Sequence, residues 1–204
     1  MSFFKSFCIM GILIGSLLAK GKTSFLPKSF HATFVKEEKS AISQKIKKNE
    51  GELYYQYPSR IRMEAKGKRK TIYISNPFQT YLYTPPVFDD VPGELTINKS
   101  KNNPMSKFFD SLKKGLVSNK IYKVKKKGQK VFLSFTKEGE KEMKIHSAEL
   151  KFLGKQEFSR LKEVQIVLDN KKKMLFRFEK IAINKELKRS LFEFDAPKNT
   201  RISR

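Results

Sequence analysis

Residues 51–63 read GELYYQYPSRIRM, and this stretch decides the class of fold. Its apolar and aromatic residues occupy alternate positions on both sides of the proline: Leu53, Tyr55, Tyr57, Ile61 and Met63. Arg60 and Arg62 occupy the positions just before Ile61 and between Ile61 and Met63. Because side chains alternate between the two faces of a strand, this pattern predicts strands with one apolar and one polar face.

The same alternation recurs along most of the chain. Further strands are predicted at 31–35, 42–46, 71–75, 80–84, 122–125, 131–136, 148–153, 164–168, 175–181 and 192–194. Turn residues separate them, such as Lys-Gly at 66–67, Glu-Gly at 138–139 and Asp-Asn at 169–170. Many short strands joined by tight turns indicate a mainly β chain of the α+β class, with an antiparallel sheet that is curled or barrel-like.

Residues 103–116 have a different period. Asn103 can cap a helix and Pro104 suits its first turn. The apolar residues then recur at helical spacing: Met105, Phe108, Phe109, Leu112 and Leu116. This predicts a short amphipathic helix. It follows a proline-rich loop at 85–92, which would allow it to move, although ordinary packing against the sheet is the alternative.

The composition excludes several classes of protein. The chain has 204 residues with 18 Phe, which is too much apolar surface for a disordered polycation. The single cysteine, Cys8, excludes an intrachain disulfide framework and a multi-cysteine zinc site. His31 and His146 are the only histidines, and neither has a partner motif. We expect no catalytic residues, no metal site, no cofactor and no enzymatic activity.

The first 19 residues have the build of a secretory signal peptide. Lys5 gives a positive start, residues 6–18 form an apolar run, and Ala19 is small enough to precede a cleavage site. An uncleaved N-terminal anchor is the alternative. We expect residues 1–19 to be the signal peptide and residues 20–204 to form a single domain.

Positive charge is the strongest bias of the chain. Lys+Arg number 44 and Asp+Glu 20, which gives a formal net charge of +24. The basic runs are 45–48, 66–70, 123–130 and 171–173. For an exported protein this favours anionic lipid head groups as partners, each nearby cation contributing about 1 kcal/mol, rather than nucleic acid. An exported protein that binds polyanions or glycolipids through its surface is the alternative function.

Five segments together resemble the LolA family of periplasmic lipoprotein carriers. In chain order they are FHATF (30–34), GELYYQYPSRIRM (51–63), SNPFQTYLY (75–83), NPMSKFFDSL (103–112) and LFEFDAP (191–197). The resemblance implies an incomplete, strongly curved antiparallel β-barrel closed by a short helical lid. An apolar cavity inside it would hold the acyl chains of lipoproteins.

The resemblance also implies partners and a compartment. A monomeric carrier in the periplasm would receive lipoproteins from an inner-membrane lipoprotein-releasing ABC transporter and pass them to an outer-membrane acceptor. One position departs from the family. Many members have an arginine before the proline of the second motif, thought to bond the lid shut, and here that residue is Tyr57.

Alternation and the resemblance together select the candidate site. The expected lipid-binding residues are Phe30, Phe34, Leu53, Tyr55, Tyr57, Ile61, Met63, Ile72, Ile74, Tyr81 and Tyr83. The expected lid residues are Met105, Phe108, Phe109 and Leu112. Packing in an ordinary core is the alternative for each of them.

Overall fold

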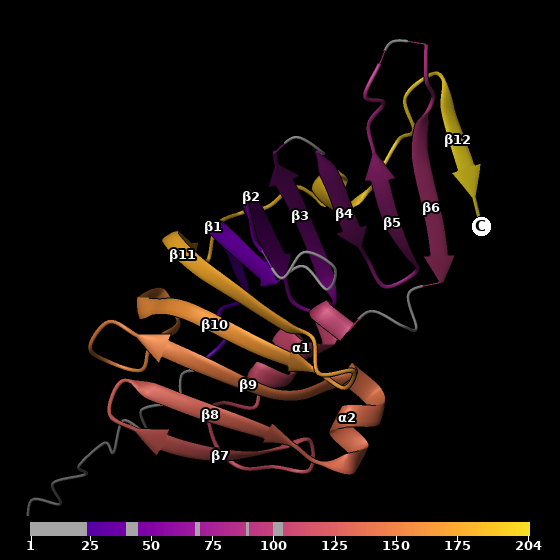
Figure 1. Ribbon diagram of the computed structural model, residues 1–204. Helices are drawn as coiled ribbons and strands as arrows, with labels where there is room; N and C mark the ends of the chain where they lie inside the picture. Colours follow the sequence, from indigo (N-terminus) through magenta and orange to yellow (C-terminus); the bar gives the residue numbers. More distant parts are fainter. Residues whose placement is uncertain (1–23, 40–44, 68–69, 89, 100–103) are drawn as a thin grey trace, which may run out of the picture.

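The computed structural model describes residues 24–39, 45–67, 70–88, 90–99 and 104–204. In this part of the chain twelve strands form one sheet in the order β12-β6-β5-β4-β3-β2-β1-β11-β10-β9-β8-β7 (Figure 1). Neighbours are antiparallel except β12 and β6, which are parallel. The sheet curls but does not close, because β12 and β7 lie at opposite ends of the order. The expected mainly β fold, an incomplete and curved barrel, is confirmed.

Most of the described chain is in strands, and its helices are short. The strands are β1 (Ser29–Lys39), β2 (Ile46–Gln56), β3 (Arg60–Lys66), β4 (Thr71–Ser75), β5 (Gln79–Thr84), β6 (Gly93–Lys99), β7 (Tyr122–Lys127), β8 (Lys130–Phe135), β9 (Ile145–Phe152), β10 (Leu161–Leu168), β11 (Lys173–Ile183) and β12 (Thr200–Ser203). The helices described are α1 (Pro104–Leu112) and α2 (Lys137–Met143), with short 3₁₀ turns η2 (Phe158–Arg160) and η3 (Arg189–Phe192).

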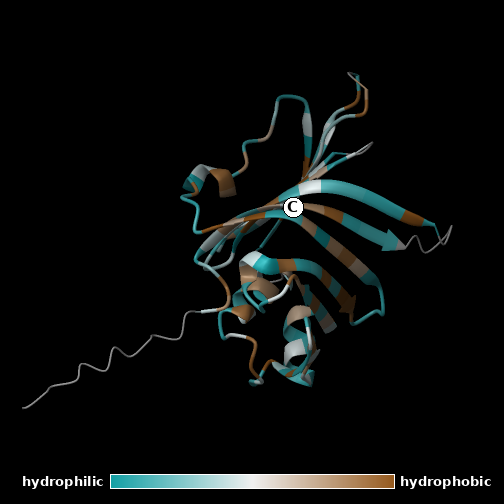
Figure 2. Cartoon of the chain, turned by 90° about the vertical axis from the view of Figure 1, so that its left-hand side faces the viewer, coloured by the Kyte–Doolittle hydropathy of each residue, from teal (hydrophilic) through white to brown (hydrophobic). Residues whose placement is uncertain are grey.

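Alternation of apolar and polar residues positions the strands. In β2 the buried positions Gly51, Leu53 and Tyr55 alternate with more exposed ones. Figure 2 shows the same change between brown and teal along the strands. Gly51 is required where it stands, because a Cβ there would lie 2.6 Å from Cζ of the Phe34 ring and 2.3 Å from the Glu64 carbonyl oxygen. The absence of a side chain therefore lets Phe34 lie across β2.

Two predictions about local structure were wrong. The Glu-Gly pair at 138–139 does not form a turn but lies in α2, because the Thr136 hydroxyl accepts a hydrogen bond from the Gly139 N–H (3.2 Å) and caps that helix. Residues 192–194 do not form a strand; they leave η3 in an irregular path over the sheet. Strands β6 and β12 were not predicted. Of the predicted strand at 42–46, residues 42–44 lie outside the described residues, as does the expected cap Asn103.

Apolar side chains gather on both faces of the sheet. The main core fills the concave face and draws on β1, β2, β3 and β7–β11 together with α1 and η2. A second cluster on the convex face contains Ile74, Tyr83, Leu95 and Phe192, all at most 6% exposed. Its cover is the segment around η3, where the Phe194 ring lies 5.0 Å from that of Tyr83.

The expected signal peptide, with Cys8, falls outside the described residues, and its assignment stays a prediction, as does the single domain 20–204. Neither helix in the described part of the chain has the length and apolar character needed to cross a membrane.

Candidate functional site

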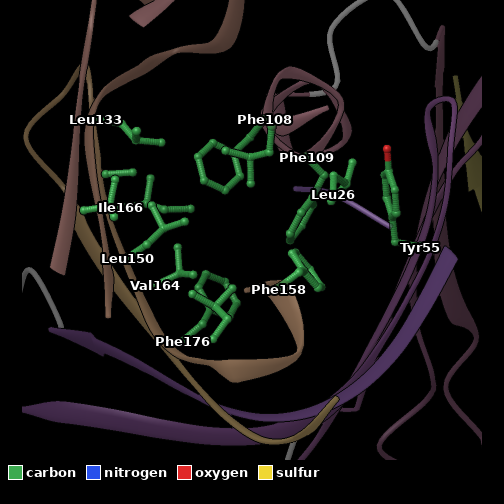
Figure 3. Packing of buried hydrophobic residues seen from close by; sticks show 14 of the residues in the cluster. Leu26, Tyr55, Phe108, Phe109, Leu133, Leu150, Phe158, Val164, Ile166 and Phe176 are labelled. Atoms are coloured by element: carbon green, nitrogen blue, oxygen red, sulfur yellow. The ribbon is translucent and has the colours of Figure 1, made fainter. Parts of the chain in front are cut away.

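Helix α1 lies over the concave face of the sheet (Figures 1 and 3). Phe108, Phe109 and Leu112 are at most 3% exposed, and Met105 is partly buried against the same core. Their spacing of three and four residues places them on one side of the helix. All four residues expected in the lid therefore face the sheet.

Six of the expected wall residues lie beneath this helix. Phe30, Phe34, Leu53, Tyr55 and Ile61 are at most 2% exposed, and Met63 is partly buried. They share one face, because Phe30 pairs with Tyr55, Tyr55 with Ile61 and Leu53 with Met63. Residues directly opposite each other in an antiparallel pair point to the same side.

Aromatic rings connect the helix to the wall. The ring of Phe109 lies 5.4 Å from that of Phe30 and 5.5 Å from that of Tyr55. Phe30 and Tyr55 stack at 5.3 Å, and Phe158 of η2 lies 4.7 Å from Phe30. Figure 3 shows Phe109, Phe158 and Tyr55 converging below the helix. This arrangement gives an apolar surface whose cover is one short helix.

The residues of β4 and β5 that were expected in this wall lie on the opposite face of the sheet. Ile61 pairs with Ser75 and Met63 with Tyr73, so Tyr73, not its neighbours, faces the concave side. The residues thereby turned to the convex face are Ile72, Ile74, Tyr81 and Tyr83. Their predicted place in the cavity wall is wrong, because the register across the β3–β4 turn is shifted by one position from the expected one.

Tyr57 is not part of the wall either. Strand β2 ends at Gln56, and Tyr57 lies in the turn that leads to β3 with 39% of its surface exposed. Its backbone N–H donates to the Lys28 carbonyl (2.9 Å), and the Lys113 Nζ lies 5.3 Å from the centre of its ring. Alternation fails here because the strand has already ended. Tyr57 instead contacts the residue that follows α1.

Asp110 ties α1 to the sheet through three hydrogen bonds. Its Oδ1 accepts from the Tyr55 hydroxyl (2.5 Å) and from the Ser59 backbone N–H (3.1 Å), and its Oδ2 accepts from the Ser59 hydroxyl (2.6 Å). Burial, and then the bond to Asp110, raise the pKa of Tyr55, so that its hydroxyl stays a donor at neutral pH. We call this group, Asp110, Tyr55 and Ser59, the latch.

The end of the helix has further anchors. The Tyr122 hydroxyl shares its one proton between the carbonyl oxygens of Gly115 (2.8 Å) and Ser111 (3.1 Å). The Lys113 Nζ donates to the Leu26 carbonyl (3.2 Å). These bonds fix the last turn, since carbonyls at a helix end lack partners within the helix. The latch acts in the same part of the helix, because Asp110 stands two residues before the end of α1.

The space under the helix is filled. A residual cavity of about 10 Å³ is lined by Leu53, Met63, Met105, Phe108, Phe109, Val164, Ile166, Phe176 and Phe178. That is about the least space that holds one water molecule, whereas pockets for drug-sized ligands measure about 300–1,000 Å³. The expected open cavity is therefore absent with α1 in this position. An acyl chain fits only if the side chains of α1 leave.

A wider hollow opens beside the end of the helix. It measures about 800 Å³, and its apolar lining includes Phe25, Leu116, Phe158 and Ile183. Lys114 and Lys126 stand among its polar residues. Because Phe158 and Leu116 also belong to the concave core, this hollow borders that core.

No group of three or more His, Cys, Asp or Glu side chains within the described ranges could hold a metal ion. The two histidines contact separate glutamates. His31 Nε2 lies 3.3 Å from Glu52 Oε2, and His146 Nδ1 lies 2.5 Å from Glu140 Oε1. The His31 side chain points to the face of β1 opposite Phe30, where its ring stacks on that of Tyr54 (4.3 Å), and the His146 side chain is exposed.

Several residues of the site were not singled out from the sequence. By spacing alone Asp110 belongs to the polar face of the helix, and Ser59 to a turn. Val164, Ile166, Phe176 and Phe178 lie in predicted strands, where the same alternation would have placed them in the wall. For Asp110 and Ser59 no pattern signals a contact, because residues 51 positions apart meet only in the folded chain.

Comparisons with known proteins give a family and a fold. A sequence model of the family described as outer membrane lipoprotein carrier protein LolA matches residues 27–195. No curated protein matches the chain. An uncharacterized conserved protein from Thermus thermophilus has a similar fold, with a TM-score of 0.50 at 9% identity over 88% of this chain and 93% of that one. An outer membrane lipoprotein-sorting protein domain from Vibrio parahaemolyticus gives 0.39 at 12% identity over 80% and 88%.

Proposed function

The chain belongs to the LolA family of outer membrane lipoprotein carrier proteins, and we propose that it is a periplasmic chaperone for lipoproteins. It binds their acyl chains against the concave face of the sheet and carries them from the inner to the outer membrane. The observation that carries this proposal is the position of α1, which covers an apolar wall and is tied to it by the latch.

The apolar side chains of α1 stand where an acyl chain would lie. Phe108, Phe109 and Leu112 are buried against the concave core while the space beside them is too small for any ligand. Loading is therefore an exchange, in which the helix withdraws and hydrocarbon takes its place. A helix that returns after release keeps the wall away from water in the empty carrier.

The free energy needed to expose the apolar side chains of α1 is similar in size to the free energy gained when one acyl chain leaves water. Exposing Phe108, Phe109 and Leu112 costs roughly 5–9 kcal/mol together, at about 1.5–3 kcal/mol for each buried side chain. Transfer of an acyl chain of about 14 methylenes out of water is worth about 11 kcal/mol. Against this packing alone, one chain gives a surplus of about 2–6 kcal/mol. The latch opposes opening by a comparable amount, so one chain roughly balances the closed helix and two or three chains drive it open. A closed state that opposes loading also favours release, because the helix returns to the wall as the cargo leaves.

The latch sets an additional barrier to opening. Hydrogen bonds to a charged group contribute about 1.5–3 kcal/mol each, and Asp110 accepts three. The latch pairs an acceptor on the helix, the Asp110 carboxylate, with hydroxyl and N–H donors at the sheet, and no arginine takes part in it. In this chain the closure of the lid is thereby carried by Tyr55 and Ser59, which flank the position where many relatives have the arginine.

The proposed partners follow from this exchange. An inner-membrane lipoprotein-releasing ABC transporter would supply the cargo, and an outer-membrane acceptor would take it. The protein acts as a monomer and catalyses no reaction. We infer that acyl chains enter through the hollow of about 800 Å³ beside the end of α1, because its apolar lining continues through Phe158 into the core.

Native mass spectrometry of the protein purified from its own cell envelope tests the proposal. A mass increase equal to a triacylated or diacylated lipoprotein supports it, and protein that carries no lipid or lipoprotein under any condition contradicts it. The alternative function is surface binding of polyanions or glycolipids, and the effect of salt on binding distinguishes it from acyl-chain binding. Surface binding weakens steeply as ionic strength rises, whereas acyl chains under α1 stay bound.

A further inference from the structure

Three connections project from the same end of the sheet. Strand β3 ends at Lys66 and β5 ends at Thr84, and both are antiparallel to the strands that follow them. The β3–β4 and β5–β6 connections consequently leave the same end of the sheet, and Gly67 and Lys70 of the first line one hollow with Thr84 and Val87 of the second. Strands β1 and β2 also turn at this end, because Glu50 in the first half of β2 pairs with Lys66.

Large apolar side chains project from this end into solvent. Val87 is 64% exposed, Phe88 is 68% exposed and Val91 is 44% exposed. Pro85 and Pro86 precede them and Pro92 follows, and prolines restrict the backbone of the loop. An apolar loop tip on an otherwise strongly basic chain marks a surface that contacts something apolar.

A lysine stands beside the apolar tip. Lys70 lines a hollow of about 590 Å³ together with Val87, Val91 and Pro85. It has no ion-pair partner among the residues that the structure describes. Acids are present as well, since Asp90 and Glu94 stand in the same loop and at the start of β6, but both are exposed and pair with no described cation.

We propose that this end of the sheet docks on an anionic phospholipid bilayer. We define the docking surface as Lys70, Val87, Phe88 and Val91. The apolar side chains enter the boundary between head groups and acyl chains, while Lys70 contacts the head groups. Exposed apolar side chains beside a cation are the combination that binds an anionic interface. The apolar side chains gain free energy by leaving water, and the cation is attracted to the negative head groups.

The proposal deepens the proposed function, because a carrier must reach a membrane to exchange its cargo. It does not need a lipoprotein for its test. Failure of vesicle binding would leave acyl-chain binding under α1 untouched, and failure of acyl-chain binding would leave the docking surface standing.

The absence of tryptophan from the chain gives a direct probe. Phe88→Trp places a single fluorophore in the docking surface, and Phe78→Trp places one at the opposite end of β5, where Phe78 is 73% exposed. Both proteins are purified from the envelope and mixed with vesicles of phosphatidylglycerol and phosphatidylcholine. The emission of Phe88→Trp should shift to the blue and be quenched by brominated acyl chains, and that of Phe78→Trp should not change.

Binding itself is measured by sedimentation with the same vesicles. Val87→Ser combined with Phe88→Ser should weaken binding about tenfold or more, because two apolar side chains no longer leave water, whereas Phe78→Ser should bind like the unchanged protein. Binding should also fall when salt is raised or phosphatidylglycerol is omitted. Equal binding to vesicles of phosphatidylcholine alone, an equal loss for Phe78→Ser, or no loss for the double variant would each overturn the proposal.

Discussion

The Tyr55 hydroxyl donates a hydrogen bond of 2.5 Å to Asp110 Oδ1, and this contact joins the concave face of the sheet to the helix that covers it. Tyr55 takes part in both halves of the closure. Its ring packs against Phe109, and its hydroxyl binds the carboxylate one residue further along α1. Closure of the helix therefore depends on apolar packing and on the latch at the same time.

Asp110→Ala should loosen α1 without altering the wall. It leaves the Tyr55 hydroxyl and the hydroxyl and backbone N–H of Ser59 without their acceptor, which should cost about 1–3 kcal/mol of unfolding free energy for each donor that stays unpaired. Uptake of a fluorescent fatty acid should become faster, and hydrogen exchange in residues 104–112 should increase. Asp195→Ala removes an exposed carboxylate elsewhere and serves as the control. Unchanged uptake and exchange in a folded Asp110→Ala protein would show that the latch does not hold the helix.

Two isoleucines distinguish the faces of the sheet. Ile61 and Ile74 are both fully buried, but Ile61 lies in the concave core and Ile74 in the convex cluster. Replacing either with threonine buries a hydroxyl in apolar surroundings, which should destabilise both proteins by about 1–3 kcal/mol. Only Ile61→Thr should weaken acyl-chain binding, by about tenfold. Equal binding by both variants in a titration with fluorescent fatty acid would contradict the assignment of the concave face.

Glu52 gives stability that depends on pH. Hydrogen bonds from Lys66 and then Tyr54 lower the pKa of its carboxyl from 4.5 to about 2. A carboxyl whose pKa is lower in the folded chain stabilises that chain above its unfolded pKa, and the contribution disappears as pH falls through the folded value. Denaturant unfolding should therefore show Glu52→Gln less stable than the unchanged protein above pH 4.5. The difference should shrink between pH 4.5 and 2; a difference that stays constant would contradict the shift.

Gly51→Ala should displace Phe34 from its place across β2. The new Cβ would lie 2.6 Å from the Phe34 ring and 2.3 Å from a backbone oxygen, and the backbone atom cannot move aside cheaply. We expect a loss of about 3 kcal/mol or more in unfolding free energy, at or above the usual cost of overpacking. Gly67→Ala, whose nearest neighbour would be the Asn49 side chain at 3.3 Å, is the matched control. Equal melting temperatures for both variants would show that β2 adapts.

Much of the fold could be predicted because alternation is a local property. The strands from β1 to β5 and from β7 to β11 follow from it, as does α1 from its helical spacing. Strand β12 and helix α2 have too few apolar residues to show a period. Residues 192–194 do show one, but they cover the convex face instead of joining the sheet.

The site could be predicted only where the sequence of a strand shows which of its faces is apolar. For Phe30, Phe34, Leu53, Tyr55, Ile61 and Met63 the apolar face is unambiguous, because the other face of those strands is polar. Strand β4 reads TIYIS, with apolar residues on both faces, so sequence alone does not determine which face turns inward. The isoleucines appeared to be the natural wall residues, but the C-terminal segment with Phe192 covers them from the other side. The contact between Asp110 and Ser59 depends on tertiary structure and leaves no trace in local sequence.

The claim that acyl chains lie between α1 and the concave face is tested most directly by photocrosslinking. A lipopeptide with a light-activated diazirine near the middle of its acyl chain is bound to the purified protein, irradiated, and mapped by mass spectrometry. The account predicts crosslinks to residues that line the filled space, such as Leu53, Met63, Phe109 and Phe176. Crosslinks confined to residues of the exposed surface, or to the convex cluster around Ile74 and Tyr83, would contradict it.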